Sequence, residues 1–401
     1  MTPVELEAWL RLTLTPGVGN ITARKLLVAF GLPEAIFCQS VSALGQVLDS
    51  QQVQQVRTEP PGLAKLLQTT LSWLAQSGSG AQQRRVVTLG DCGYPSALQS
   101  LDDPPLMLYL LGAGEFTDKT PLAPAEHAST APYLEATPYP ISPANCLAVV
   151  GSRNPTPQGL IHAREFCKTL GQAGLTIVSG LALGIDGAAH EGALSAPAST
   201  VAVVGTGLDR VYPKAHHALA HRIAQTGLLV SEYPLGTPPL TANFPKRNRL
   251  IAGLAQGTLV VEAALKSGSL ITARLSAEQG KDVFAIPGSI HAAQARGCHA
   301  LIKQGAKLIE SAQDVLEEFA LPGAFNNAIN SVAVDACRTS AKGLFDEQNL
   351  LLDSLGFDPM GLDALQARTG LDAAQLQVQL LNLELDALVA RLPGGLFQRL
   401  S

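Results

Sequence analysis

Seven short, apolar, β-branched runs in the middle of the chain constrain its fold more than any other feature. Strands that are apolar on both faces are typical of parallel sheets, and the segments between these runs are long enough for crossover helices. The pattern therefore predicts an α/β core over residues 146–320, with helices on both faces of a parallel sheet. The runs are Leu147–Val150, Leu175–Val178, Thr200–Val204, Leu228–Val230, Thr258–Val261, Val283–Ile286 and Lys307–Ile309.

The N-terminal region reads as short helices. Apolar residues recur at helical spacing, first at Leu6, Leu10 and Leu14. A Thr15–Asn20 hairpin with two glycines follows, and it either directs backbone N–H groups at a phosphate or is a tight turn. We expect residues 1–112 to form a small helical domain of the helix-hairpin-helix (SAM-like) type, with strand-like runs at 85–89 and 106–110.

The remaining segments predict two linkers and a terminal domain. Residues 113–145 hold six prolines and little periodicity, which suits a linker or an insertion, and a second linker is expected at 321–344. Residues 345–401 show three helical patterns and a final hairpin, the layout of a winged helix. The recognition helix expected at 372–385 contains Asp372 and Glu384 but no Lys or Arg, which favours a protein partner over DNA for this domain.

Charge is distributed unevenly along the chain. The 401 residues have a net charge of −5, which excludes a uniformly basic nucleic-acid coat. Residues 147–307, however, contain 15 Lys and Arg against 8 Asp and Glu, so the predicted core favours an anionic ligand.

Cysteine usage and hydropathy predict the compartment. The six cysteines are scattered, without a C-x-x-C pair or the spacing of a zinc site, so we expect reduced thiols and no metal. There is no 18-residue apolar run and no basic-plus-apolar leader. We therefore expect a cytoplasmic protein without a membrane span.

Small and polar residues follow almost every predicted strand. Ligands of open α/β sheets bind beyond the carboxyl ends of the strands, and glycines and serines at helix N-termini offer N–H groups to phosphate. Nearby cations and Phe244, whose ring can stack on a base, favour a nucleic acid as the ligand. The candidate binding residues are Gly151, Ser152, Arg153, Ser179, Gly180, Gly205, Gly207, Lys214, Phe244, Lys246, Arg247, Asn248, Arg249, Ser267, Gly268 and Ser269.

Several polar residues in these loops have a structural alternative. Asp186 either caps a neighbouring loop or touches the ligand, whereas His190 is expected to be a buried structural histidine. Glu262 is expected to pair with an arginine instead of acting in catalysis. For one of Arg247 and Arg249, the alternative to ligand binding is a structural ion pair. For Gly205-x-Gly207, the alternative is a turn whose backbone geometry demands glycine.

Two common enzyme templates are missing from the sequence. The phosphate-binding G-x-x-x-x-G-K-[ST] motif is absent, so a P-loop ATPase is not supported. The G-x-G-x-x-G fingerprint does not follow the first predicted strand of the core, which argues against a dinucleotide-dependent dehydrogenase.

Taken in order, the motifs of residues 147–310 resemble the DNA-processing protein A family (DprA/Smf). No single motif is specific to this family, but the whole set of motifs in this order and spacing is specific to it. The motifs are Gly151-Ser152-Arg153, Ser179–Asp186 with His190, Gly205–Asp209 with Tyr212-Pro213, Phe244–Arg249, Ser267–Ala273 and Pro287-Gly288.

The resemblance implies a Rossmann-like core that binds single-stranded DNA and forms a homodimer. It implies a recombination mediator, not an enzyme, without a cofactor, that protects incoming DNA during natural transformation and loads the recombinase RecA. By the same resemblance, Arg153 would hold a backbone phosphate, Lys214 would line the same basic pocket, and the Ser267–Ser269 loop would donate N–H groups. Phe244, with the cations at 246, 247 and 249, would continue the path of the strand.

The chain departs from the family pattern at two positions, and one alternative function stays open. His216 and His299 stand where the family often has asparagine; neither change removes a cation, but local contacts there are in question. The alternative is an enzyme that acts on a small nucleotide, similar to a phosphoribohydrolase, with Asp186 and Glu262 as acid and base. The Phe244–Arg249 cluster favours DNA, because it extends positive charge beyond a pocket for one nucleotide.

Overall fold

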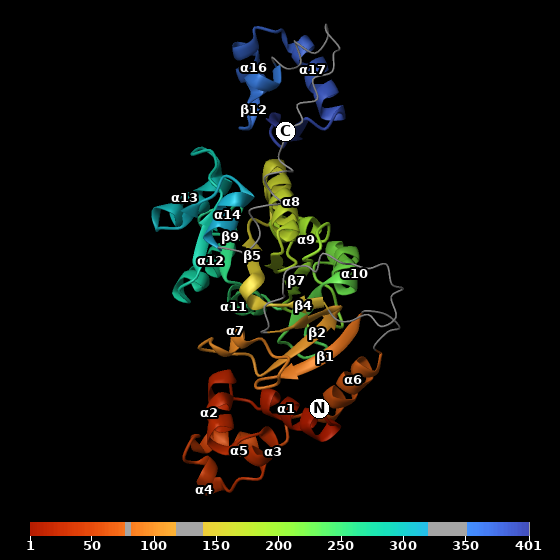
Figure 1. Ribbon diagram of the computed structural model, residues 1–401, viewed down its shortest axis with the longest axis vertical. Coiled ribbons are helices and arrows are strands. Elements are labelled where there is room, and N and C mark those ends of the chain that lie inside the picture. Colours follow the sequence, from red (N-terminus) through yellow and green to blue (C-terminus); the bar gives the residue numbers. More distant parts are fainter. Residues whose placement is uncertain (77–81, 118–138, 320–350, 401) are drawn as a thin grey trace.

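A nine-stranded sheet forms the centre of the molecule (Figure 1). The computed structural model describes residues 1–76, 82–117, 139–319 and 351–400. The order of the strands across the sheet is β1-β2-β8-β7-β6-β5-β9-β10-β11. The strands are β1 (Gln83–Thr88), β2 (Met107–Gly112), β5 (Cys146–Val150), β6 (Thr176–Ser179), β7 (Thr200–Val203), β8 (Leu228–Ser231), β9 (Gly257–Val260), β10 (Asp282–Ala285) and β11 (Lys307–Leu308).

The seven strands predicted for the core are confirmed, and all of them are parallel. The chain runs from β5 outward through β6 and β7 to β8, and then returns to place β9 on the other side of β5. The order of the strands therefore reverses between β5 and β9. Loops that leave the carboxyl ends of two such strands diverge and leave a crevice, which is where ligands bind in open α/β sheets.

Strands β1 and β2 extend the sheet beyond β8. They form an antiparallel pair, and β2 is antiparallel to β8, with Tyr109 opposite Ser231. Residues 83–112 thus add an edge to the same sheet that the later strands build. The predicted domain limits stay predictions; the 321–344 linker and most of the 113–145 segment lie outside the described residues. The short strands β3 (Gly114–Phe116) and β4 (Tyr139–Ile141) pair separately.

Helices cover both faces of the sheet because alternate residues of each strand point to opposite sides. In β5, for example, Ala148 packs in the core on one face and Val149 in the core on the other. One face is covered by α7 (Ser96–Gln99), α11 (Asn243–Leu254), α12 (Ser269–Glu278) and α13 (Arg296–Lys303). The other is covered by α8 (Pro157–Gln172), α9 (Ile185–Ala193), α10 (His217–Thr226) and α14 (Ala312–Glu318).

The N-terminal helices pack around their own apolar core, which also includes Leu106 and Met107 from the sheet edge. The hairpin between the first two helices has a left-handed Gly17 (φ 73°), and the Gln52 side chain donates to its carbonyl oxygen at 2.9 Å. The tight turn is therefore observed, while a role in phosphate binding stays a prediction. The helices are α1 (Pro3–Leu14), α2 (Asn20–Phe30), α3 (Pro33–Phe37), α4 (Val41–Leu44), α5 (Ser50–Arg57) and α6 (Leu63–Ala75).

The C-terminal residues form the predicted winged helix. A three-stranded sheet in the order β12-β14-β13 packs with two helices and a helical stretch at 351–355 around a separate apolar core. Within the described residues, no helix has both the length and the apolar character needed to cross a membrane. The elements are β12 (Met360–Gly361), α16 (Leu362–Thr369), α17 (Ala373–Leu385), β13 (Val389–Leu392) and β14 (Leu396–Arg399).

Substitution of Gly192 by alanine should destabilise the core. A Cβ atom at this position of α9 would lie 2.1 Å from the backbone oxygen of Arg164 in α8. Overpacking of this kind costs about 1–3 kcal/mol, against a gain in helix propensity of about 1 kcal/mol. We expect a lower urea midpoint for Gly192→Ala. Gly19→Ala, where the added Cβ meets nothing within 4 Å, should shift it less. An unchanged midpoint for Gly192→Ala would mean that α8 and α9 can separate without cost.

Candidate nucleic-acid interface

A pocket of about 580 Å³ lies where the order of the strands reverses. The loops that follow β5 and β9 form two of its walls, joined by a hydrogen bond from the Ser152 N–H to the Glu262 carbonyl oxygen at 2.7 Å. The N-terminal half of α11 forms another wall. Nine of the sixteen predicted residues line this pocket: Gly151, Ser152, Arg153, Phe244, Arg247, Asn248, Ser267, Gly268 and Ser269.

An exposed cation and two aromatic rings meet in this pocket. The Arg153 guanidinium lies 5.7 Å from the centroid of the Phe244 ring, and the Tyr212 ring lies 5.6 Å from the same centroid. Tyr212 is 47% exposed, and the exposed Lys266 also lines the pocket. This arrangement offers charge to a phosphate and π-faces to a base. Neither Tyr212 nor Lys266 was among the predicted site residues, although Tyr212 belongs to one of the family motifs and Lys266 directly precedes another.

The Ser267–Ser269 loop forms the N-terminus of α12, a helix of ten residues. The two serine hydroxyls lie 2.7 Å apart, and the Asn248 side chain donates to the Gly268 carbonyl oxygen at 3.4 Å. The loop thus lies between α11 and the start of α12. The positive end of the helix dipole favours an anion at this point, while the N–H groups of Ser267, Ser269 and Leu270 already donate to protein acceptors.

Arg247 lines the pocket, yet it is only 4% exposed. Its Nη1 donates to the carbonyl oxygen of Gly180 at 2.6 Å and to that of Val203, at the carboxyl ends of β6 and β7. Burial lowers the pKa of Arg247 to about 10, so the side chain stays charged at neutral pH. A Cβ atom at Gly180 would lie 2.5 Å from the guanidinium, which explains the glycine there. Arg247, which was predicted to bind the nucleic acid, therefore has a structural role first of all.

A strained turn follows β6 and borders the pocket. Leu181 is buried and has a positive φ of 58°, a conformation that costs energy for a side chain of this size. Asp186 accepts the amides on either side of Leu181 at 3.1 and 3.3 Å. His190 Nε2 accepts the Leu181 N–H at 3.3 Å, and His216 Nδ1 donates to its carbonyl oxygen at 3.0 Å. Three side chains therefore hold this one turn.

These contacts decide between the alternatives for the buried polar residues. His190 bonds through Nδ1 to the Thr200 hydroxyl at 2.8 Å, and burial lowers its pKa to about 3, which fits the expected structural histidine. Asp186 orients the loop, and burial raises its pKa while Arg247 opposes the shift. The prediction that Glu262 pairs with an arginine was wrong. The Glu262 carboxylate instead accepts the backbone N–H and the hydroxyl of Thr156, at 2.9 and 2.5 Å.

The remaining predicted glycines and Ser179, the last residue of β6, have structural roles. The Ser179 hydroxyl is buried and donates to the Val149 carbonyl oxygen at 2.6 Å. A Cβ atom at Gly205 would lie 3.2 Å from the Phe244 ring, and one at Gly207 would lie 2.7 Å from the Pro234 carbonyl oxygen. Neither Gly205 nor Gly207 has a positive φ, so close packing, and not the turn geometry that was left open, favours glycine at these positions.

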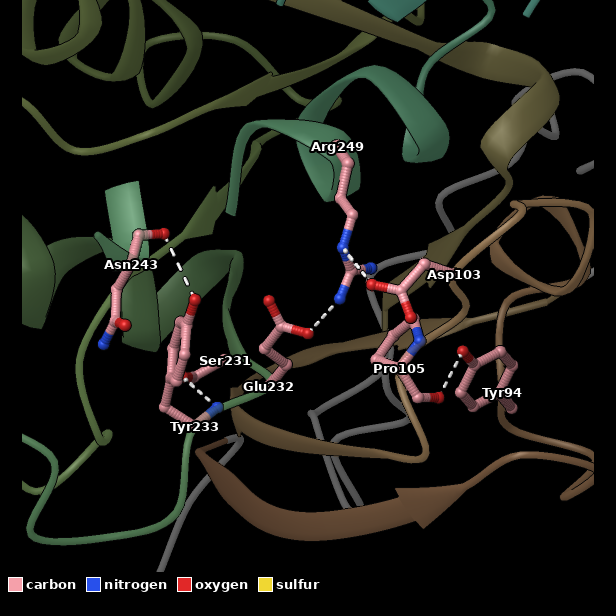
Figure 2. A network of polar contacts seen from close by, with 8 residues as sticks. All are labelled: Tyr94, Asp103, Pro105, Ser231, Glu232, Tyr233, Asn243 and Arg249. Carbon is pink, nitrogen blue, oxygen red and sulfur yellow. Dashed lines mark hydrogen bonds and ion pairs between the residues drawn. The ribbon is translucent and has the colours of Figure 1, made fainter. Parts of the chain in front are cut away.

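Three predicted cations do not line the pocket. Lys214 and Lys246 are exposed and lie two residues beyond Tyr212 and Phe244, respectively. Arg249 instead forms ion pairs with Glu232 and with Asp103, as Figure 2 shows. Of the two arginines for which a structural ion pair was left open, Arg249 is therefore the one that forms it.

The two departures from the family pattern have defined contacts. His216 holds the turn at Leu181, and His299 Nε2 lies 2.9 Å from the Gly288 carbonyl oxygen. Among the described residues, there is no group of three or more His, Cys, Asp or Glu side chains that could hold a metal ion.

Comparison with known proteins gives matches along the whole chain. The family described as DNA recombination-mediator protein A matches residues 136–320, and the DprA winged helix domain matches residues 338–395. Protein Smf of Synechocystis is 32% identical over 425 residues, the full length of both chains. Protein Smf of Escherichia coli is 44% identical over 62% of this chain and 66% of its own length.

Two comparisons concern a streptococcal relative. The DNA processing protein DprA of Streptococcus pneumoniae is 45% identical over 58% of this chain and 72% of its own length. The X-ray structure of DNA processing protein A from that organism superposes with a TM-score of 0.56 at 34% identity, covering 80% of this chain and 98% of that one. Sequence motifs, fold and full-length similarity agree, and the chain belongs to the DprA/Smf family of DNA recombination mediators.

Proposed function

We propose that this protein is a recombination mediator that binds single-stranded DNA in the pocket between β5 and β9. The observation that carries the proposal is the exposed Arg153 guanidinium beside the rings of Phe244 and Tyr212. Arg153 and the positive N-terminal end of α12 would bind backbone phosphates, while the two rings would stack on bases.

The exposed Tyr212 ring and the half-buried Phe244 ring favour a single strand over a duplex. Stacking on an aromatic side chain contributes about 1–3 kcal/mol per base, but it requires a base whose π-face is free. In a duplex these faces are covered by neighbouring base pairs. A duplex would therefore keep the phosphate contacts of Arg153 and lose the stacking on Phe244 and Tyr212.

The positions of the other cations favour a strand over one nucleotide. Lys266 lines the pocket, and the exposed Lys214 and Lys246 follow its aromatic residues along the chain. Both acid–base candidates of the nucleotide-enzyme alternative are occupied, because Asp186 accepts two backbone N–H groups and Glu262 is held by Thr156. We therefore favour the mediator over the enzyme.

The proposal includes protection of incoming DNA during natural transformation and loading of RecA, in the cytoplasm. For the winged helix, we propose a protein contact instead of a DNA contact. Helix α17 exposes Val378, Leu381 and Leu385 at spacings of three and four residues, so they share one face of the helix. A DNA-reading helix would present Lys or Arg to the phosphates, and α17 contains neither.

Replacement of Arg153 should weaken binding to a labelled poly-dT strand about tenfold, measured by fluorescence anisotropy. One lost phosphate contact should also reduce the magnitude of the negative slope of log affinity against log salt (the salt slope) by about 0.7. Arg222→Ala is the matched control, because Arg222 is also exposed but lies in α10, which runs back from the carboxyl ends of the strands. Equal affinity of Arg153→Ala and wild type would refute the proposed pocket, and equal binding of the duplex would refute the preference for a single strand.

On α17, Leu381→Asp should separate DNA binding from recombinase loading. Affinity for poly-dT should stay within about twofold of wild type, while RecA assembly on strands covered by a single-strand-binding protein should be lost. The control is Gln366→Glu, which adds the same charge at an exposed position of α16 and leaves the apolar face of α17 unchanged. Normal loading by Leu381→Asp would argue against α17 as the contact.

Homodimer formation is a further part of the proposal. Light scattering at micromolar concentration should give about twice the chain mass of 41.9 kDa. A mass equal to that of one chain over the working concentration range would contradict it.

A further inference from the structure

We propose that Arg249 positions helix α11 in the DNA pocket and does not bind phosphate itself. It acts with Glu232, Tyr233 and Asn243, and these four residues are called the α11 clamp below. This inference rests on the proposed function, since it concerns the helix that presents Phe244 and Asn248 to the pocket. Figure 2 shows the clamp at the carboxyl end of β8, with Asp103 on its other side.

The ion pair of the clamp is too enclosed to reach a DNA strand. Arg249 Nη2 bonds to Glu232 Oε2, and Arg249 Nε lies 3.5 Å from Asp103 Oδ2. The Arg249 side chain is 15% exposed and that of Glu232 is 10% exposed. Both charges are therefore directed toward each other inside the protein, and Arg249 is absent from the pocket lining.

A second set of hydrogen bonds holds the start of α11. The Tyr233 hydroxyl donates to the carbonyl oxygen of Asn243 at 3.2 Å, and the Asn243 side chain donates to the Gly205 carbonyl oxygen at 3.1 Å. The Ser231 hydroxyl accepts the Tyr233 N–H at 3.0 Å and donates to Thr206 at 2.7 Å. The loops after β7 and β8 thus hold the first residue of the helix.

The location of these contacts on the helix explains their effect on the site. Phe244 and Asn248 are four residues apart, so they share the face of α11 that borders the pocket. Asn243 and Arg249 are the residues directly before and after this pair. Contacts at both positions fix the rotation of α11 about its axis, and that rotation decides where the Phe244 ring lies.

The sign of the effect of Glu232→Gln tests this inference. Removal of a carboxylate near a polyanion would tighten DNA binding if charge alone mattered. A positioning role predicts the opposite, a loss of about three- to tenfold in poly-dT affinity. Arg249→Ala should lose about as much, with the salt slope of wild type. Arg153→Ala, which removes a phosphate contact, should lower that slope by about 0.7. In Glu232→Gln/Arg249→Ala the two losses should not add, because both break the same pair.

Hydrogen exchange gives a readout that does not depend on DNA. Amides of α11 should exchange faster in Arg249→Ala and Glu232→Gln than in wild type, and at the wild-type rate in Arg153→Ala. Tyr233→Phe, which removes only the hydroxyl, should give a smaller effect of the same kind. If Arg249→Ala does not fold, the nearly isosteric Glu232→Gln carries the test.

Two results would overturn the inference. A salt slope that falls by about 0.7 in Arg249→Ala, together with unchanged or tighter binding by Glu232→Gln, would make Arg249 a phosphate ligand. Unchanged α11 exchange in both variants would show that the clamp does not hold the helix. Failure of the wild-type protein to bind poly-dT is a different outcome: it would refute the proposed function, while the exchange data would still test the clamp.

Discussion

One buried arginine organises the carboxyl edge of the sheet. Arg247 donates from α11 to the carbonyl oxygens that end β6 and β7, and so it ties the helix that borders the pocket to the sheet beneath it. A buried guanidinium is stable only if its donors are paired, so the two carbonyl groups and the nearby Asp186 carboxylate belong to one unit. The glycine at 180 is a consequence of this packing, because a Cβ atom there would meet the guanidinium.

The same type of side chain has three roles within this small region. Arg153 is exposed beside the Phe244 ring, Arg247 is enclosed among carbonyl groups, and Arg249 pairs with Glu232. An exposed guanidinium can exchange water for phosphate, whereas Arg247 and Arg249 already donate to acceptors inside the protein. The division of roles allows the pocket to keep a fixed shape while it presents charge to a ligand.

Local sequence patterns predicted well the strands and the helix-terminal loop that surround the pocket. The seven parallel strands follow from apolar runs of strand length, and the Ser267–Ser269 loop follows from small residues before a helix. The winged helix was also predictable, because its hairpin and helices have strong local signals. Tyr212 and Lys266 were missed as site residues, although Tyr212 lies within a recognised motif and Lys266 directly precedes one. Their location in the pocket depends on how loops from different strands converge.

The sequence by itself determined the order of strands and helices along the chain, the edge of the sheet at which the pocket lies and the excess of cations in the core. These properties depend on residue type and spacing along the chain. Only the tertiary structure decided which cations are available, and it separated Arg153 from Arg247 and Arg249. It also showed that Glu262 pairs with Thr156 instead of an arginine. The physical reason is that availability depends on burial and on partners from distant segments. Asp103 and Glu232, which enclose Arg249, lie 146 and 17 residues from it along the chain.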